Sequence, residues 1–279
     1  MANFGRTQHI TMNFLSRLLS PKKLVNKYYL TVCVIVKDED DYLAEFVNFH
    51  LKAGVEHFYI YDNESKVPAR EVIAKAGLSE FVTITDFPGK SKLVPSYDHC
   101  LKHYGNSSFW ISFLDMDEFI VAKSTHGNIS LFLKDYENYA GVVINWQLFG
   151  SGNHLKRTNL PQMESYTLKA EESFHVNRHI KSIVQPKYVA KAGNAHHFKY
   201  KKGYFAVNEN FEQVEGSHAD VSVNKIQINH YYCRSLEEYA DKVNRGRADS
   251  KNKRSMQEFH NHDADANVIK DTTILELFK

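Results

Sequence analysis

Cysteine is scarce in this chain of 279 residues, which has only Cys33, Cys100 and Cys233. An odd number of cysteines at such wide spacing gives neither a disulfide framework nor the C-x-x-C spacing of a zinc site. A reducing compartment is therefore the simplest setting, and we expect the protein to be cytoplasmic.

Long apolar runs and a strong charge excess are also missing. No stretch of 18 apolar residues exists, so no transmembrane helix is expected. A net charge of +2, from 35 Lys and Arg against 33 Asp and Glu, is far from that of nucleic-acid-binding proteins, so no nucleic acid partner is expected. Residues 1–28 form a basic segment with an apolar patch at positions 14–19 but no signal-peptide cleavage site. This segment could contact a membrane surface, pack on the domain or fray.

Strands and helices alternate over the first 120 residues. Buried-type apolar runs predict strands at 31–36, 57–61, 81–85 and 109–114. Helical spacing predicts helices that begin near Leu43, Pro68 and Pro95. This order is typical of an α/β fold with a mostly parallel sheet and helices on both faces, in which 31–36 and 57–61 are parallel neighbours. We find no repeat.

The second half of the chain has a looser pattern. Strands are predicted within 139–150 and 225–232, and a helix at 235–247 with Ser235 and Glu238 as a capping box. No clean boundary appears, so residues 29–250 are expected to form a single domain whose second half elaborates the sheet. Residues 251–279 are expected to be a polar tail with a terminal helix, and partial disorder is expected over 248–268.

Acidic residues follow the predicted strands, most densely in "FLDMDEFI". Asp115 and Asp117 are two apart, so in an extended backbone their side chains share one side, while Met116 points into the core. Such paired carboxylates suit Mg²⁺ or Mn²⁺, which usually retains water and substrate phosphates as further ligands. D-x-D also occurs by chance in solvated loops. Phosphatases of the haloacid dehalogenase type use it after the first strand, with Thr or Val at the fifth position, where this chain has Phe119.

Six segments in a fixed order resemble glycosyltransferase family 92 and bacterial family-2-like transferases over roughly residues 29–250. They are "VKDEDDYLAEFVNFHLKAGVEHFYIYDNES", "FWISFLDMDEFI", "NWQLFGSGNH", "HIKSIVQP", "NAHHF" and "INHYYCRSLEEYADKVNRGR". The resemblance implies a GT-A-type, Rossmann-like sheet that binds a nucleotide sugar, with a metal-binding D-x-D and an acceptor-side elaboration.

The resemblance also assigns roles to individual residues. It implies that Asp117 binds Mn²⁺ or Mg²⁺ directly, that Asp115 contacts the ribose or the metal, and that His230 completes the metal site. It places a second group against the nucleotide sugar, consisting of Lys37, Asp62, Asp115, Lys242, Arg245 and Arg247. Each has a plainer alternative: Asp62 in "DNES" suits an Asx turn, and basic residues commonly end a helix.

The acceptor side and the general base are less defined. Trp146 and Phe149 are suited to stacking on a sugar, although Trp in a strand is more often core. Lys181 and His197 fall in matching motifs without a derived role. Inversion, expected by family analogy, requires a base that takes the acceptor's proton, and the candidates are Glu118, His154 and Glu171.

The expected activity is transfer of a sugar from a nucleotide donor, a UDP-linked hexose, to a saccharide or lipid-linked acceptor in bacterial surface polysaccharide or lipopolysaccharide synthesis. The setting would be the cytoplasm, at the inner face of the membrane. The alternative is a non-catalytic GT-A-like module that binds glycan or nucleotide, or serves in assembly. A metal-dependent phosphohydrolase is a more distant alternative.

Overall fold

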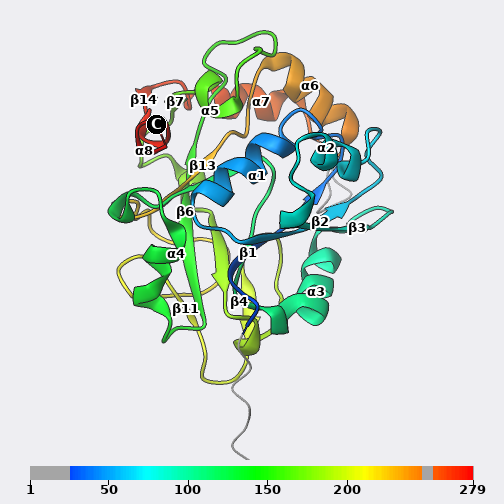
Figure 1. Cartoon of the computed structure of the whole chain (residues 1–279). Coiled ribbons are helices and arrows are strands. Elements are labelled where there is room, and N and C mark those ends of the chain that lie inside the picture. The colour runs from blue at the N-terminus through cyan, green and yellow to red at the C-terminus, as the bar shows by residue number, and fades with distance from the viewer. Residues whose placement is uncertain (1–25, 247–253, 279) are drawn as a thin grey trace, which may run out of the picture.

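A ten-stranded mixed sheet forms the centre of the protein, as seen in the computed structural model, which describes residues 26–246 and 254–278 (Figure 1). Along the sheet the order is β12-β11-β6-β8-β4-β1-β2-β3, and β13 joins β6 to β5. The strands are β1 Tyr28–Val36, β2 His57–Asp62, β3 Val82–Asp86, β4 Ser108–Phe113, β5 Glu118–Val121, β6 Gly141–Leu148, β8 Ile180–Val184, β11 Ala206–Val207, β12 Gln213–Val214 and β13 Gln227–His230.

Parallel pairing dominates the first half of the sheet. Strand β1 pairs in parallel with β2 and with β4, and β2 pairs in parallel with β3, as the alternation of strands and helices predicted. Strand β8 differs, because it lies antiparallel between β4 and β6. An antiparallel strand starts at the edge of the sheet where the neighbouring strands end. The first residues of β8 therefore lie at the carboxyl ends of β4 and β6.

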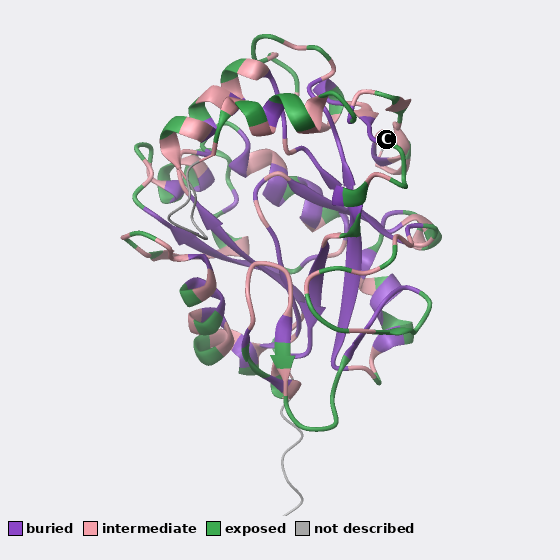
Figure 2. Ribbon diagram, turned by 180° about the vertical axis from the view of Figure 1, so that it is seen from behind, coloured by how far each residue is buried: buried purple, intermediate pink, exposed green. Residues whose placement is uncertain are grey.

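Helices cover both faces of the sheet, which explains why its strands are continuous apolar runs. On β1, Val32 and Val34 face the core shared with α1 and α2, whereas Cys33 and Ile35 face α3. Figure 2 shows the buried sheet between helices with exposed outer sides. The helices are α1 Leu43–Lys52, α2 Ala69–Lys75, α3 Leu93–Tyr104, α4 Ile129–Phe132, α5 Gln162–Ser165, α6 Leu236–Arg245, α7 Met256–Asp263 and α8 Thr273–Leu277.

Two small sheets flank the main one: β7 (Leu168–Lys169) with β14 (Ile269–Lys270), and the hairpin of β9 (Val189–Ala192) with β10 (Phe198–Tyr200). The capping box of α6 is confirmed, because Ser235 and Glu238 each accept a hydrogen bond from the other's backbone. In the parts of the chain that the structure describes, no helix is long and apolar enough to cross a bilayer.

The C-terminal stretch corrects one expectation. Residues 254–268, where partial disorder was expected, hold α7 and the turn after it, and the expected terminal helix is α8. Phe259, Ala266 and Ile274 are buried, and the Asp263 carboxylate accepts hydrogen bonds from the backbone and hydroxyl of Ser151. Apolar residues this sparse give no periodic pattern, so these elements depend on tertiary contacts and, for α7, on an N-cap in which the Ser255 side chain accepts from the Glu258 backbone N–H.

Candidate active site

A cleft of about 370 Å³ opens at the carboxyl ends of the parallel strands. The loops after β1, β2, β3 and β4 contribute to its wall, and β6, β13 and α6 close it from the other side. Ligands of α/β sheets bind at this edge. Prominent lining residues are Lys37, Asn63, Asp115, Asp117, Trp146, His196, His230, Lys242 and Arg245.

The loops around the cleft hold strained backbone. Asp38, Glu64, Ser91 and Arg234 all have φ between 50° and 63°, the left-handed region that residues with a side chain rarely occupy. Each follows the carboxyl end of a different strand, namely β1, β2, β3 and β13. Strain of this kind persists only where surrounding contacts hold it, and it gathers at functional sites.

Asp115 is held in place by a buried lysine. Lys181, at the start of β8 and with a side chain only 1% exposed, places its Nζ 2.9 Å from Asp115 Oδ2 and 3.2 Å from Glu118 Oε2. Glu118 Oε2 also accepts a hydrogen bond from the Asp115 backbone N–H at 2.8 Å. Met116 is buried, but residues 116 and 117 form a turn rather than the extended backbone from which the alternation was predicted. The lysine and the glutamate therefore fix the D-M-D turn from beneath.

Burial dominates the ionisation of this group. It raises the pKa of Glu118 well above the ordinary value, and Lys181 opposes the shift only in part. Burial would lower the pKa of Lys181, but Asp115 and Glu118 reverse this and hold that pKa well above its usual range. Lys181 is therefore a permanent cation below the D-M-D turn.

Asp117 has a different set of partners. Lys242 of α6 donates to Asp117 Oδ2 at 2.6 Å and to the Tyr232 carbonyl at 2.8 Å. His230 Nε2 lies 3.5 Å from Asp117 Oδ1. Burial opposes ionisation of Asp117, yet Lys242 and His230 outweigh it and keep the pKa of that carboxyl well below 3.8.

Asp117 and His230 fit a divalent cation that is shared with a substrate. Burial lowers the pKa of His230, so its imidazole is neutral at pH 7 and able to bind a metal. A separation of 3.5 Å is within reach of two ligands that each lie about 2.1 Å from one ion. Across residues 26–246 and 254–278, no three His, Cys, Asp or Glu side chains cluster as a complete metal site. Asp115 therefore does not join the other two, and a bound phosphate and water would supply the missing ligands.

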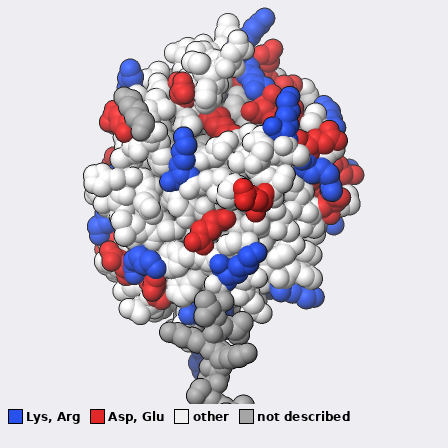
Figure 3. Space-filling view, in the orientation of Figure 1, with Lys and Arg blue, Asp and Glu red and all other residues white. Residues whose placement is uncertain are grey.

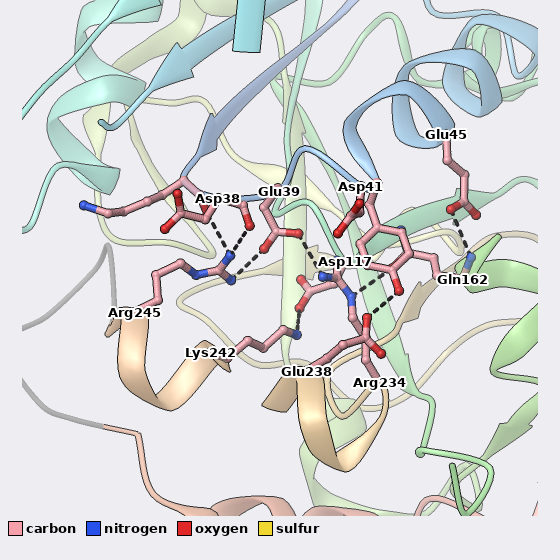
Figure 4. Close-up of polar contacts among 12 residues, drawn as sticks. Asp38, Glu39, Asp41, Glu45, Asp117, Gln162, Arg234, Glu238, Lys242 and Arg245 are labelled. Carbon is pink, nitrogen blue, oxygen red and sulfur yellow. Dashed lines mark hydrogen bonds and ion pairs between the residues drawn. The ribbon is translucent and has the colours of Figure 1, made fainter. Parts of the chain in front are cut away.

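A second charge network secures the wall formed by the loop after β1 (Figure 4). The buried Glu39 carboxylate accepts from Arg234 Nη1 at 2.8 Å and from Arg245 Nη2 at 2.6 Å. Arg245 Nη1 also donates to the carbonyls of Lys37 and Asp38 at 2.7 and 2.8 Å. Arg234 stacks over the Tyr42 ring. This network ties α6 to the loop that carries Lys37.

Only some of the residues predicted to contact the nucleotide line the cleft. Lys37, Lys242 and Arg245 line the cleft. Asp62 does not: it is buried, and its two carboxylate oxygens accept from the backbone N–H groups of Ser65 and Ala69. This is the turn-forming alternative, and the neighbouring Asn63 lines the cleft instead. Arg247 lies outside the described residues.

The predicted acceptor side needs several corrections of position. Trp146 lines the cleft against His230, at 4.2 Å between ring centroids. Phe149 is fully buried against Tyr231, so it offers no surface to a sugar. Lys181 lies beneath the D-M-D turn, as described above.

His197 is also displaced from its expected place. It lies against Asn194 and Ser217, and its neighbour His196 reaches the cleft.

None of the three base candidates is in a position to take a proton from an acceptor in the cleft. The Glu118 side chain has no exposed surface and contacts Lys181 and the Asp115 backbone. His154 lies beside Tyr166, and Glu171 lies on the surface between β7 and the turn that follows it. Neither lines the cleft.

Several residues of the site escaped sequence reasoning. Glu39 and Arg234 hold the α6 wall, and Lys90, His196 and Arg254 line the cleft. The run "KDED" after the first strand was a visible signal for Glu39, because the residues after a strand reach the ligand edge. Arg234 gave no signal, since its partner lies 195 positions away.

The family model of glycosyltransferase family 92 matches residues 28–272, well over half of the chain. The chain belongs to glycosyltransferase family 92. A family 92 protein of Ricinus communis is 27% identical over 195 residues, which cover 65% of this chain and 33% of that protein. One of Oryza sativa subsp. japonica is 26% identical over 221 residues, which cover 76% and 35%. This family 92 chain thus spans about a third of the length of the curated relatives it matches.

Solved structures are more distant. The glucosyl-3-phosphoglycerate synthase of Mycobacterium tuberculosis, in complex with Mn²⁺, UDP-glucose and phosphoglyceric acid, has a TM-score of 0.33 and 12% identity, over 58% of each chain. A mycobacterial protein has a TM-score of 0.29 and 14% identity, over 43% of this chain and 42% of that one. Scores this low carry no conclusion about the family 92 chain.

Proposed function

We propose that the chain is a metal-dependent glycosyltransferase that moves a sugar from a nucleotide-sugar donor to a saccharide hydroxyl. The observation that carries the proposal is the pair of Asp117 and His230, 3.5 Å apart, in the lining of a cleft that also holds Lys37, Lys242 and Arg245. Membership of family 92 supports the reaction class. The two aspartates are both intact, which favours an enzyme over a non-catalytic module of the same fold.

Each group of the cleft has a proposed task. Asp117 and His230 would hold Mn²⁺ or Mg²⁺, which supplies a Lewis acid for the departing diphosphate. Lys242, Arg245 and Lys37 add positive charge around the same diphosphate, and fixed charges aimed at a leaving group stabilise its departure. Asp115, held by Lys181 at one oxygen, keeps Oδ1 for a ribose hydroxyl. Trp146 forms the wall against which the transferred sugar would pack.

The finer assignments are proposals of the same kind. The donor is a UDP-linked hexose, and the acceptor is a saccharide or a lipid-linked glycan of a bacterial surface polysaccharide or lipopolysaccharide. The reaction inverts the anomeric centre, and the protein works in the cytoplasm at the inner face of the membrane. We assign no general base.

A donor panel tests the proposal directly. The full chain is mixed with UDP-, GDP- and dTDP-sugars, with and without Mn²⁺, and both the melting temperature and the released nucleotide are measured. We expect one nucleotide class to raise the melting temperature only with metal, and to be released when an acceptor is added. Binding without release over a broad acceptor panel would favour the non-catalytic module. If no nucleotide changes the melting temperature with metal present, the proposal is wrong.

A further inference from the structure

A second surface begins at the end of the strands opposite the cleft and extends along the β9–β10 hairpin, whose tip at Ala195 and His196 reaches the cleft. Residues 186–205 include five lysines and no acid. We call the exposed lysines and aromatic residues of this stretch, together with the half-buried Tyr188, the basic end. It consists of Lys187, Tyr188, Lys191, Lys199, Lys201, Lys202, Tyr204 and Phe205. On the face shown in Figure 3, acidic and basic side chains are interspersed.

Two lysines of the basic end face each other directly. Lys191 on β9 and Lys199 on β10 are cross-strand partners in the hairpin, and both are exposed. Like charges directly opposite one another in an antiparallel pair destabilise it. Among the ion pairs of the described residues, none involves a lysine of the basic end. The hairpin therefore keeps an unfavourable pair that an external anion would relieve.

Aromatic side chains accompany these charges. Tyr204 is 48% exposed and Phe205 is 37% exposed, both in the loop between β10 and β11. Tyr204 stacks on Tyr188, and Lys187 Nζ lies 4.6 Å from the Tyr188 ring centroid. Exposed aromatic rings beside lysines suit a boundary between water and lipid, where each side chain has an apolar body and a polar end.

The N-terminal segment joins the fold at the same end. The side chain of Asn26 donates to the Asn106 carbonyl. Asn106 belongs to a short turn, 105–107, that packs on the turn 186–188 carrying Lys187 and Tyr188. Figure 1 shows the start of β1 and the loop after β10 at the lower end of the molecule. Residues 1–27 contain two Arg and three Lys and no acid.

Three acidic side chains approach this surface from other elements. Asp98 of α3 accepts from the backbone N–H of Ala192, Glu137 pairs with Lys134 and interacts at longer range with Lys187, and Glu215 shares a small hollow with Tyr204 and Phe205. No ion pair within the described ranges joins these acids to a lysine of the basic end, so much of the positive charge is left for a partner outside the chain.

We propose that the basic end docks the protein on an anionic lipid bilayer, with Tyr204 and Phe205 at the headgroup level and the lysines against the phosphates. A membrane is favoured over a soluble anion because the exposed lysines are spread over the surface rather than gathered around one point, and because exposed aromatic rings lie among them. Each lysine near an anionic bilayer strengthens binding by roughly fivefold. Five such residues are enough for reversible docking.

Docking at this end has a consequence for the acceptor, which rests on the proposed function. Strand β1 runs from Tyr28 near the basic end to Val36 at the cleft, and nine residues of strand span roughly 25–30 Å. The docked cleft would stand that far above the lipid phosphates. The acceptor would then be a glycan that already extends several sugar units from its lipid.

Vesicle flotation of the full chain tests the docking. Wild type is compared with K201E/K202E, with Y204S/F205S and with the control K52E/K75E, whose two lysines are exposed on α1 and at the end of α2. Vesicles contain phosphatidylcholine alone or with phosphatidylglycerol. We expect wild type and control to float only with the anionic vesicles, and K201E/K202E to bind at least 25-fold more weakly. We expect Y204S/F205S also to bind the anionic vesicles more weakly than wild type.

The remaining outcomes would overturn the proposal. These are equal flotation of all four proteins, or no flotation of wild type. Binding to soluble dextran sulfate with no binding to vesicles would identify an anionic glycan as the partner instead. Nucleotide-induced thermal shifts, measured on the same proteins, should be equal in all four, so failure of docking is distinguishable from failure of the transferase proposal.

Discussion

The lysines at the two ends of the sheet differ in their burial and in their partners. At the cleft, Lys181 and Lys242 are almost completely buried, and each contacts a carboxylate. At the basic end, Lys191 and Lys199 are exposed and face one another without an acid. A buried charge is tolerated only when it is paired and hydrogen-bonded, whereas water screens an exposed charge at little cost. The cleft charges are thus fixed by the fold, and those of the basic end are available to an external partner.

The largest expected effect comes from Asp117, because it would hold the metal. Asp117→Asn should lower the rate of sugar transfer by roughly a thousandfold, since a cation at a leaving diphosphate contributes several kcal/mol. The rate is measured with the donor that the panel identifies. Asp86→Asn is the matched control: Asp86 also ends a strand, but its side chain is 71% exposed and pairs with Arg70.

Two results would contradict this prediction. Equal rates for Asp117→Asn and Asp86→Asn would remove Asp117 from the chemistry. An Asp117→Asn protein that no longer folds, judged by circular dichroism, would instead make Asp117 a structural acid paired with Lys242.

Lys181 and Lys191 give the most direct test of the difference between the two ends. Lys181→Met leaves Glu118 and Asp115 without their cation and should reduce the free energy of unfolding by about 3–5 kcal/mol. Lys191→Met removes an exposed charge and should change that free energy by less than about 0.5 kcal/mol. Urea denaturation of both variants measures the two values. Similar losses of unfolding free energy in the two variants would show that burial of Lys181 does not determine how much it contributes to stability.

A substitution at Glu39 tests whether charge holds the loop after β1 against α6. Burial alone would raise its pKa, but Arg234 and Arg245 outweigh burial and hold that pKa below 4.5. A depressed folded-state pKa means that the ionised carboxylate stabilises the fold above pH 4.5, and that this contribution is lost as the pH falls through the folded value. Glu39→Gln should therefore cost about 3 kcal/mol at pH 7 and progressively less below pH 4.5.

Denaturation curves for wild type and Glu39→Gln at several pH values check the sign. The difference between the two proteins must shrink toward acid. A difference that stays constant from pH 7 to pH 3.5 would mean that packing, rather than the charge on Glu39, holds the loop to α6.

The sheet and the position of the D-M-D segment were accessible from the sequence because local patterns encode them. Apolar runs located the strands, and strand order put Asp115 at the ligand edge, whereas the turn at residues 116–117 was not expected. Lys181 and Arg234 were not accessible as partners of the site. Lys181 reaches Asp115 only because β8 enters the sheet antiparallel, a choice of topology that no local pattern records. Asp62 shows a further limit, since "DNES" suits both a turn and a ligand and only the backbone contacts decide.

The smallest expected effect is a gain in stability at the basic end. Lys199→Glu converts the pair with Lys191 from like to opposite charges, which should raise the free energy of unfolding by about 0.2–1 kcal/mol. The same change should weaken flotation with anionic vesicles, because it removes a positive charge and adds a negative one. Lys199→Gln is the control that removes charge alone and should give about half of each effect. If Lys199→Glu is more stable but binds vesicles as wild type does, the like-charge pair has no part in docking. If the variant is more stable and binds more weakly, the hairpin retains two lysines that lower its own stability and strengthen docking.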